Sequence, residues 1–287
     1  MQTVRALIVG GDSGIGKALS HALLERNWRV SSTSRHPDGR QGFHYLDLET
    51  LNGLENLPSC DHLFLCAAMT KISSCREAPG RARKINVEAP VEVIRDASSR
   101  GAHAIFLSTS AVFDGAVPRQ RSEALPAPSS EYGSLKADAE RILLSTFPEN
   151  AVLRLTKVLV PGATVLSSWA HSLKRGEKIS AFYDMFMAPI TPDDVVDPLI
   201  AMAVQKTRGI VQTSASEDIS YFDAAQYLAQ SLDVDWSLVS GCSAVDAGIP
   251  AGERPRYTSL DTERLNTLLR RKANPPTLAL DTLIRFS

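Results

Sequence analysis

The first 26 residues carry the feature that most restricts the fold. The apolar run "RALIVG" (5–10) ends at glycines spaced G-x-x-x-G-x-G, namely Gly10, Gly14 and Gly16, and a helical pattern follows over 16–26. Glycine permits positive φ in a tight turn and lets the backbone approach a ligand. A helix N-terminus supplies N–H groups that bind phosphate. The stretch predicts a nucleotide-binding strand–turn–helix, and a βα turn without a ligand is the alternative.

Short apolar runs and helical patterns alternate through the first half of the chain. Helical patterns occur at 76–99 and 131–146. The further runs are "RVSSTS" (29–34), "FHYLDL" (43–48), "HLFLCAA" (62–68), "AIFLSTS" (104–110) and "NAVLRLTKVL" (150–159). Such alternation is typical of a parallel sheet covered by helices on both faces. We expect an α/β doubly wound (Rossmann) sheet with ligands at the carboxyl ends of its strands.

The end of the second run indicates which dinucleotide the turn holds. A site for NAD(H) usually has a carboxylate there, whereas this chain has Ser34 and Arg35. Arg35 can clamp a 2′-phosphate, with Arg40 adding charge, so NADP(H) is predicted; a solvated surface arginine is the alternative.

Further cofactor contacts are expected around the same turn and at the ends of the next strands. Asp47 can accept from the adenine amino group, or it can cap a loop. Small side chains near the fourth strand let the backbone pass close to the ribose, although they are also normal in a sheet core. The remaining predicted cofactor residues are Asp12, Ser13, Ile15, Leu48, Ala67 and Ala68.

A candidate catalytic group lies on the helix predicted over 131–146. Tyr132 and Lys136 are four residues apart and therefore share one helical face. A nearby ammonium favours tyrosinate and can bind ribose hydroxyls, while the phenol can protonate a carbonyl oxygen. Ser108, Thr109 and Ser110 end the fifth run, where one hydroxyl can bind a substrate carbonyl. Hydroxyls that satisfy only their own backbone are the alternative.

These motifs occur in the order of a known family. The chain resembles an extended short-chain dehydrogenase/reductase and is similar to the dTDP-4-dehydrorhamnose reductase (RmlD-like, sugar-nucleotide-binding) family. "STSAVFDG" resembles that family's S-T-D-Y-V-F-D-G, and "PAPSSEYGSLKADAE" resembles its P-x-x-x-Y-G-x-x-K-x-x-x-E. "AAMT", "INVEAP", "APITPDDVVDPL" and "RPRYTSLDTERL" follow the family's order.

The resemblance implies roles for the matched residues. It implies that Thr109 is the catalytic hydroxyl, Tyr132 the acid and Lys136 its helper, with Asn86 a structural residue. Arg254 matches a region near the diphosphate of a nucleotide sugar, and a surface ion pair is its alternative role. Three departures concern the substrate: Ser110–Ala111 replaces Asp-Tyr, Lys157 and Leu159 replace aromatics, and the 184–190 segment is unusually apolar.

The pattern loosens after residue 160. We expect an NADP-binding Rossmann domain over 1–160. Residues 161–287 are expected to form mainly a substrate-binding lobe, with segments near 190–215 returning to the first domain. The net charge of −1 gives no pull toward nucleic acid or membrane. No signal peptide, apolar span, CxxC pair or metal-ligand spacing is evident, so a cytoplasmic protein without a metal site is expected.

These features favour an NADP(H)-dependent reductase of a keto group, on a nucleotide-activated sugar of the 4-keto-6-deoxy type. One alternative is an epimerase or dehydratase of a nucleotide sugar, in which the cofactor stays bound and is recycled. Another is a non-catalytic NADP-binding regulatory subunit. The expected partner is a small-molecule substrate, and a homodimer is compatible with the sequence.

Overall fold

A seven-stranded parallel sheet forms the centre of the protein. The computed structural model describes residues 3–285, so the outermost ends of the two predicted domains lie outside the described residues. The strands are β1 (Arg5–Val9), β2 (Arg29–Ser34), β3 (Phe43–Tyr45), β4 (His62–Leu65), β5 (His103–Thr109), β6 (Ala151–Leu155) and β9 (Gly209–Thr213). Their order, β3-β2-β1-β4-β5-β6-β9, reverses between β1 and β4. The predicted α/β doubly wound class is confirmed, and the reversal marks the crevice where such sheets bind ligands.

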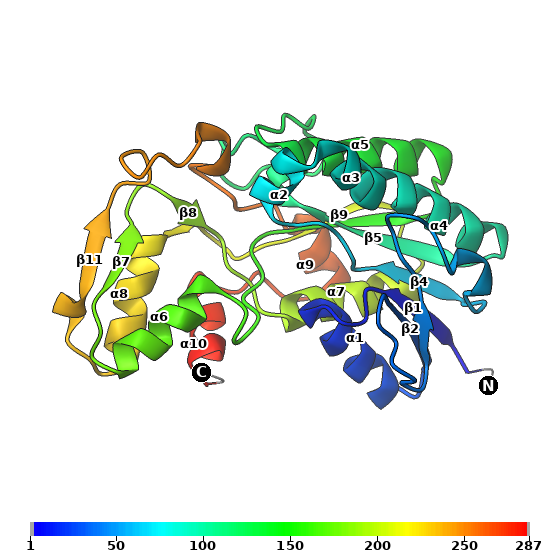
Figure 1. Ribbon diagram of the computed structural model, residues 1–287, viewed down its shortest axis with the longest axis horizontal. Coiled ribbons are helices and arrows are strands. Elements are labelled where there is room, and N and C mark those ends of the chain that lie inside the picture. Colours follow the sequence, from blue (N-terminus) through cyan, green and yellow to red (C-terminus); the bar gives the residue numbers. More distant parts are fainter. Residues whose placement is uncertain (1–2, 286–287) are drawn as a thin grey trace.

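Helices cover both faces of this sheet (Figure 1). One face packs against α1 (Gly14–Glu25), α7 (Asp193–Val204) and α9 (Glu263–Leu269). The other side carries α2 (Ile72–Glu77), α3 (Pro79–Arg83), the π-helical turn η2 (Lys84–Glu88), α4 (Ala89–Ser99) and α5 (Glu131–Thr146). Both faces are therefore buried, which explains why the strands are continuous apolar runs without polar alternation.

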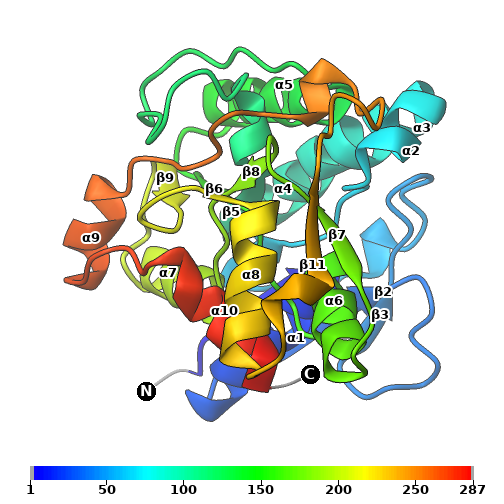
Figure 2. The same ribbon diagram turned by 90° about the vertical axis from the view of Figure 1, so that its left-hand side faces the viewer.

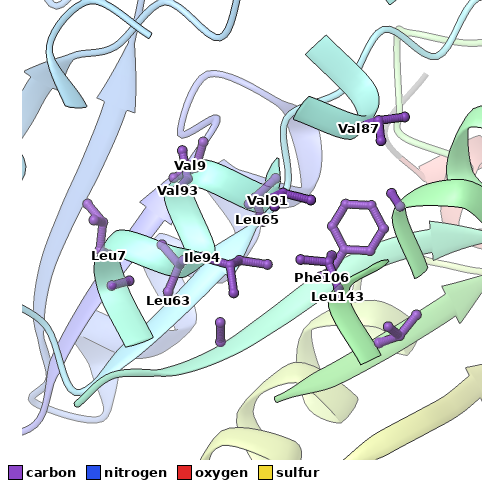
Figure 3. Close-up of a cluster of buried hydrophobic side chains, with 14 of the residues drawn as sticks. Leu7, Val9, Leu63, Leu65, Val87, Val91, Val93, Ile94, Phe106 and Leu143 are labelled. Atoms are coloured by element: carbon purple, nitrogen blue, oxygen red, sulfur yellow. The ribbon is translucent and has the colours of Figure 1, made fainter. Parts of the chain in front are cut away.

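The core under α4 and α5 shows how the two layers meet. Figure 3 shows side chains of β1, β4 and β5 packed against side chains of these helices. Leu7, Leu63 and Phe106 from the sheet, and Ile94 from α4, are each at most 1% exposed. Burial of this extent stabilises the fold by about 1.5–3 kcal/mol for each large apolar side chain.

A smaller lobe lies across the molecule from the N-terminal end of β1, at the left of Figure 1, and faces the viewer in Figure 2. Its helices are α6 (Val165–Lys174), α8 (Tyr221–Ser231) and α10 (Pro276–Arg285), and α8 packs against both others. Its strands are β7 (Ile179–Phe182), β8 (Phe186–Met187), β10 (Ile219–Ser220) and β11 (Val239–Cys242). β11 pairs with β7 in parallel, and β10 pairs with β8 antiparallel. Between lobe segments, α7 and β9 return to the large sheet.

Three local predictions, one of a helix and two of strands, were wrong in extent. The helix predicted over 76–99 is divided, because Pro79 lacks an N–H group and the preceding Ala78 leaves the helical region, at φ −135° and ψ 65°. The strands predicted over 43–48 and 150–159 end early, at Tyr45 and Leu155. Within residues 3–285, the structure contains no helix whose length and apolar character would let it cross a membrane.

Two buried histidines at the amino ends of β4 and β5 predict acid sensitivity. His62 stacks on Trp28 and meets the His103 ring edge-on, with both histidines 7% exposed. Burial, reinforced by His103, lowers the pKa of His62 to about 4, and burial also lowers the pKa of His103. Both rings are thus neutral in the folded protein over a range in which the unfolded chain takes up protons.

We therefore expect the free energy of unfolding to be highest above pH 6.5 and to fall by about 1–3 kcal/mol as the pH drops from 6.5 to 4. Denaturant unfolding at several pH values measures this slope. His62→Phe should flatten it, whereas the exposed control His21→Gln should leave it unchanged. An identical slope in His62→Phe would show that other groups cause the acid sensitivity.

Candidate functional site

A cavity of about 550 Å³ opens at the carboxyl ends of β1, β2 and β4. It brings together most of the predicted cofactor residues: Gly10, Asp12, Ser13, Gly14, Ile15, Ser34, Arg35, Asp47, Leu48, Ala67 and Ala68. These residues come from four separate stretches of the chain, which the strand order places at one edge. The cavity lies at the reversal of strand order, where the fold is expected to bind a ligand.

The glycine turn is held tightly against the neighbouring strand end. Gly10 has φ +93°, and a Cβ there would lie 2.8 Å from the Ala67 side chain. A Cβ on Gly16 would lie 2.3 Å from the Gly10 carbonyl oxygen, which also explains why Gly16 sits below the turn and does not line the cavity. A Cβ on Gly14 would likewise lie 2.8 Å from Val160 Cγ1, so packing alone disfavours a side chain at all three positions.

The same turn directs the N-terminus of α1 at the cavity. Ser13 is the N-cap: its Oγ accepts from Gly16 N at 2.9 Å and donates to Gly10 O at 2.8 Å. Gly14 and Ile15, in the first turn, line the cavity. A helix start with a cleared backbone surface fits the pyrophosphate of a dinucleotide.

The two arginines predicted to bind a 2′-phosphate, Arg35 and Arg40, differ in their partners. Arg40 is paired with Asp12 at 2.8 Å and lies over the Phe43 ring, and this pairing lowers the pKa of Asp12. Arg35 is exposed and lines the cavity, and no hydrogen bond or ion pair within residues 3–285 engages its side chain. Arg35 is therefore available to an anion, while Arg40 neutralises the nearby carboxylate.

The cavity is also lined by residues that were not among the predicted cofactor contacts. Arg81 of α3 lines it and is paired with Glu49 at 2.8 Å. Asp47 caps its own loop by accepting from Glu49 N at 2.9 Å, the alternative role considered for it. The other cavity residues absent from the prediction are Val9, Thr33, Leu46, Cys66, Met69, Thr70, Ile85 and Val160. Of these, Met69 and Thr70 belong to the quoted motif "AAMT", and Ile85 belongs to "INVEAP".

Asn86 holds the segment that carries this motif. Its amide oxygen accepts from Met69 N and its amide nitrogen donates to Met69 O, both at 2.9 Å. The side chain is 1% exposed and lies in the π-helical turn η2. Asn86 thus gives the backbone of Met69, which borders the cavity, the two hydrogen bonds that a neighbouring strand would otherwise provide.

Tyr132 and Thr109 meet where α5 begins and β5 ends. The Thr109 side chain is near enough to the Tyr132 phenol to lower its pKa, and Thr109 Oγ1 accepts from Ala111 N at 3.1 Å. Burial raises the pKa of Tyr132 above its ordinary value, with a smaller contribution from Cys75, and outweighs the lowering by Thr109. The phenol, which lies near a hydroxyl, is therefore protonated at neutral pH.

Lys136 lies one helical turn further along α5. It is 2% exposed, donates from Nζ to Leu107 O at 2.5 Å, and lies 3.8 Å over the Phe106 ring. Burial lowers its pKa to about 7, and Glu140 and Cys66 oppose that change. Cys66 lines the cavity, so the lysine lies close to the candidate cofactor site, although neither Lys136 nor Tyr132 lines it.

Gly133 permits this close approach of helix and strand. A Cβ at this position would lie 2.0 Å from the Ala111 carbonyl oxygen. Ser130 caps the helix, accepting from Gly133 N at 3.2 Å. The glycine next to Tyr132 had no role in the sequence analysis, yet it sets the distance between α5 and the β5 end.

The predicted substrate residues are placed differently from one another. Ser108 is 3% exposed, and within the described part of the chain its hydroxyl finds no hydrogen-bond partner. Ser110 begins the 3₁₀ turn η3 (Ser110–Val112) beside Thr109. Arg254 donates from Nε to Ile249 O at 2.7 Å and does not line the cavity.

Comparison with known proteins agrees with the fold and with the order of the motifs. The family model described as "RmlD substrate binding domain" matches residues 4–285. Methionine adenosyltransferase 2 subunit beta of Pongo abelii is 24% identical over 92% of this chain and 82% of its own. The probable low-salt glycan biosynthesis reductase of Haloferax volcanii is 26% identical, over 91% and 90%. The structure of dTDP-4-dehydrorhamnose reductase from Bacillus anthracis in complex with NADP superimposes with a TM-score of 0.88 at 20% identity, covering 100% of both chains.

The contact at Gly133 predicts a position-specific effect of one methyl group. Gly133→Ala should lower the free energy of unfolding by about 1–3 kcal/mol, because α5 must move away from Ala111. Gly80→Ala is the matched control, since Gly80 is also helical, has no atom within 4 Å of its would-be Cβ, and should tolerate alanine with unchanged or higher stability. Equal stability of the two variants in urea unfolding would refute the tight contact.

Proposed function

Because the chain belongs to the RmlD substrate binding domain family, we propose that it is an NADP(H)-dependent reductase of a keto group on a nucleotide-activated sugar. The observation that carries the proposal is the position of Tyr132 near Thr109, with Lys136 one helical turn away and acting on Cys66, which lines the glycine-turn cavity. Both a reductase named for glycan biosynthesis and a dTDP-4-dehydrorhamnose reductase are among the similar proteins, which supports a 4-keto-6-deoxy sugar as substrate.

The cavity residues divide into three cofactor contacts. The α1 N-terminus with Ser13, Gly14 and Ile15 holds the pyrophosphate. Arg35 binds the 2′-phosphate, and the small residues Ala67 and Ala68 border the ribose on the nicotinamide side. When bound, NADPH supplies the hydride.

The protein's own groups handle the proton and the carbonyl oxygen. Tyr132 donates its phenolic proton to the substrate oxygen, and its raised pKa keeps that proton available at neutral pH. Thr109 orients the phenol and the carbonyl, while Lys136 binds ribose hydroxyls and favours the tyrosinate left after proton transfer. Ser108 and Ser110, which flank Thr109 in the chain, and Arg254 are the candidate substrate contacts.

A regulatory subunit is the second candidate, because methionine adenosyltransferase 2 subunit beta aligns over 92% of this chain. Such a role requires NADP binding without turnover. A co-purified enzyme in stoichiometric amount, together with no NADPH consumption across dTDP- and UDP-keto-sugars, would favour it over the reductase.

Tyr132→Phe tests the catalytic assignment. With a dTDP-4-keto-6-deoxy sugar and NADPH, turnover should fall by about 10²–10⁴, because general acid catalysis is lost. NADPH binding, followed by fluorescence, should remain close to that of the parent. Parent-like turnover in this variant would remove Tyr132 from the mechanism.

Arg35→Ala tests the choice of cofactor. The affinity for NADPH should fall about 10- to 100-fold while the affinity for NADH stays the same, since only NADPH presents a 2′-phosphate. The matched control is Arg29→Ala, at the exposed amino end of the same strand. A parallel loss for both cofactors would place Arg35 elsewhere in the site.

A further inference from the structure

Arg154 and Glu140 form a buried ion pair directly behind the proposed catalytic lysine. Their side chains are 1% and 3% exposed. Arg154 Nε donates to the two carboxylate oxygens of Glu140 at 3.0 and 3.1 Å, and Nη2 donates at 2.7 Å. A pair buried this deeply is commonly no more stabilising than apolar residues of the same volume, so stability alone is a weak reason for it.

The pair ties α5 to two strands of the sheet. Arg154 lies on β6 opposite Ser108, in the register that also places Leu155 opposite Thr109. Its Nη1 donates to Ser122 O at 3.1 Å and to the Gln212 side chain on β9 at 3.3 Å. Glu140 is on α5, so its bidentate contact fixes the rotation of the helix that carries Tyr132 and Lys136.

Glu140 is also the carboxylate one helical turn from Lys136, since i and i+4 share a face. On other elements, the titratable groups near Lys136 and Tyr132 are Cys66 after β4 and Cys75 of α2, while β5 presents the Phe106 ring and the Leu107 carbonyl. Lys136 of α5 and Arg154 of β6 are therefore two buried basic side chains, and the Glu140 carboxylate interacts with both.

We infer that Glu140 and Arg154 are positioning residues, whose buried pair holds Lys136 in place and keeps its amino group protonated for the proposed reaction. The inference rests on the proposed role of Lys136 as a ribose-binding ammonium. Burial opposes the charge of Lys136, and the Glu140 carboxylate opposes burial. Arg154 limits how much of that carboxylate's charge acts on Lys136, because it shares the same two oxygens.

The two single variants have opposite expected effects on Lys136. Glu140→Gln removes the carboxylate, so Lys136 should titrate about one pH unit or more below the parent. Arg154→Met leaves the carboxylate with Lys136 as its nearest cation, so Lys136 should titrate above the parent. Both variants should unfold at lower temperature, because each leaves one buried charge without its partner.

The titration is measured in the cofactor-free protein by NMR with ¹³C-labelled lysine, and Lys136→Met identifies the signal. The double variant Glu140→Gln/Arg154→Met covers the case in which a single variant does not fold. It should regain thermal stability, yet its Lys136 should still titrate below the parent, because burial then acts without the carboxylate. A double variant with recovered stability and an unmoved Lys136 titration would reduce the pair to a structural role.

Fluorescence titration with NADPH at pH 6 and pH 8 provides the second readout. If Lys136 binds ribose as an ammonium, the affinity for NADPH should fall from pH 6 to pH 8 in every protein. This fall should be larger in Glu140→Gln than in the parent, and smaller in Arg154→Met. Equal pH dependence in all proteins, despite the shifted titrations, would overturn the proposed ribose role of Lys136. Shifted titrations in a protein that binds NADPH but reduces no keto-sugar would uphold the positioning and refute the reductase.

Discussion

The positions of Tyr132 and Lys136 depend on how closely α5 approaches the end of β5. The carbonyl of Ala111 occupies the space that a side chain at Gly133 would need, so only glycine allows the helix to start there. Ser130 caps the first turn of α5 by accepting from Gly133 N. About one turn later, Lys136 Nζ donates to the carbonyl oxygen of Leu107 on β5. The position of Tyr132 near Thr109 follows from this approach. The close backbone packing at Gly133 thus permits the observed positions of Tyr132 and Lys136.

The polar groups under α5 are costly to bury, and their arrangement indicates how that cost is limited. Lys136 satisfies one donor on Leu107 and places its charge against the Phe106 ring, an arrangement that favours a cation in a dry site. Arg154 has its guanidinium donors directed at Glu140, Ser122 and Gln212, and Gln212 in turn donates to Gln120 O and Asp261 O. The network therefore extends from α5 across β6 and β9 to the segment that leads into α9.

Local patterns in the sequence predicted six of the seven strands of the large sheet, the doubly wound class and most of the residues that line the cavity at the glycine turn. Glycine spacing, apolar runs and the i, i+4 pair report on residues that are close in the chain, and each of these found its structural counterpart. Arg81 and Val160 could not be found in this way, because they reach the cavity through a broken helix and a loop after β6. The break at Pro79 was readable from the sequence, whereas the direction of the chain beyond it depends on contacts with α5.

The segment around residues 249–257 connects the smaller lobe to the same end of the sheet. A Cβ on Gly252 would lie 2.1 Å from the Ser129 carbonyl, and one on Gly115 would lie 2.5 Å from Pro255, so this segment packs directly on the residues before α5 and after η3. Glu253 also pairs with Arg76 of α2 at 2.7 Å. Arg254, held by the Ile249 carbonyl, therefore belongs to a segment that joins the lobe to the end of the sheet where α5 begins. A displacement of the lobe would therefore strain these contacts at the start of α5, where Tyr132 is located.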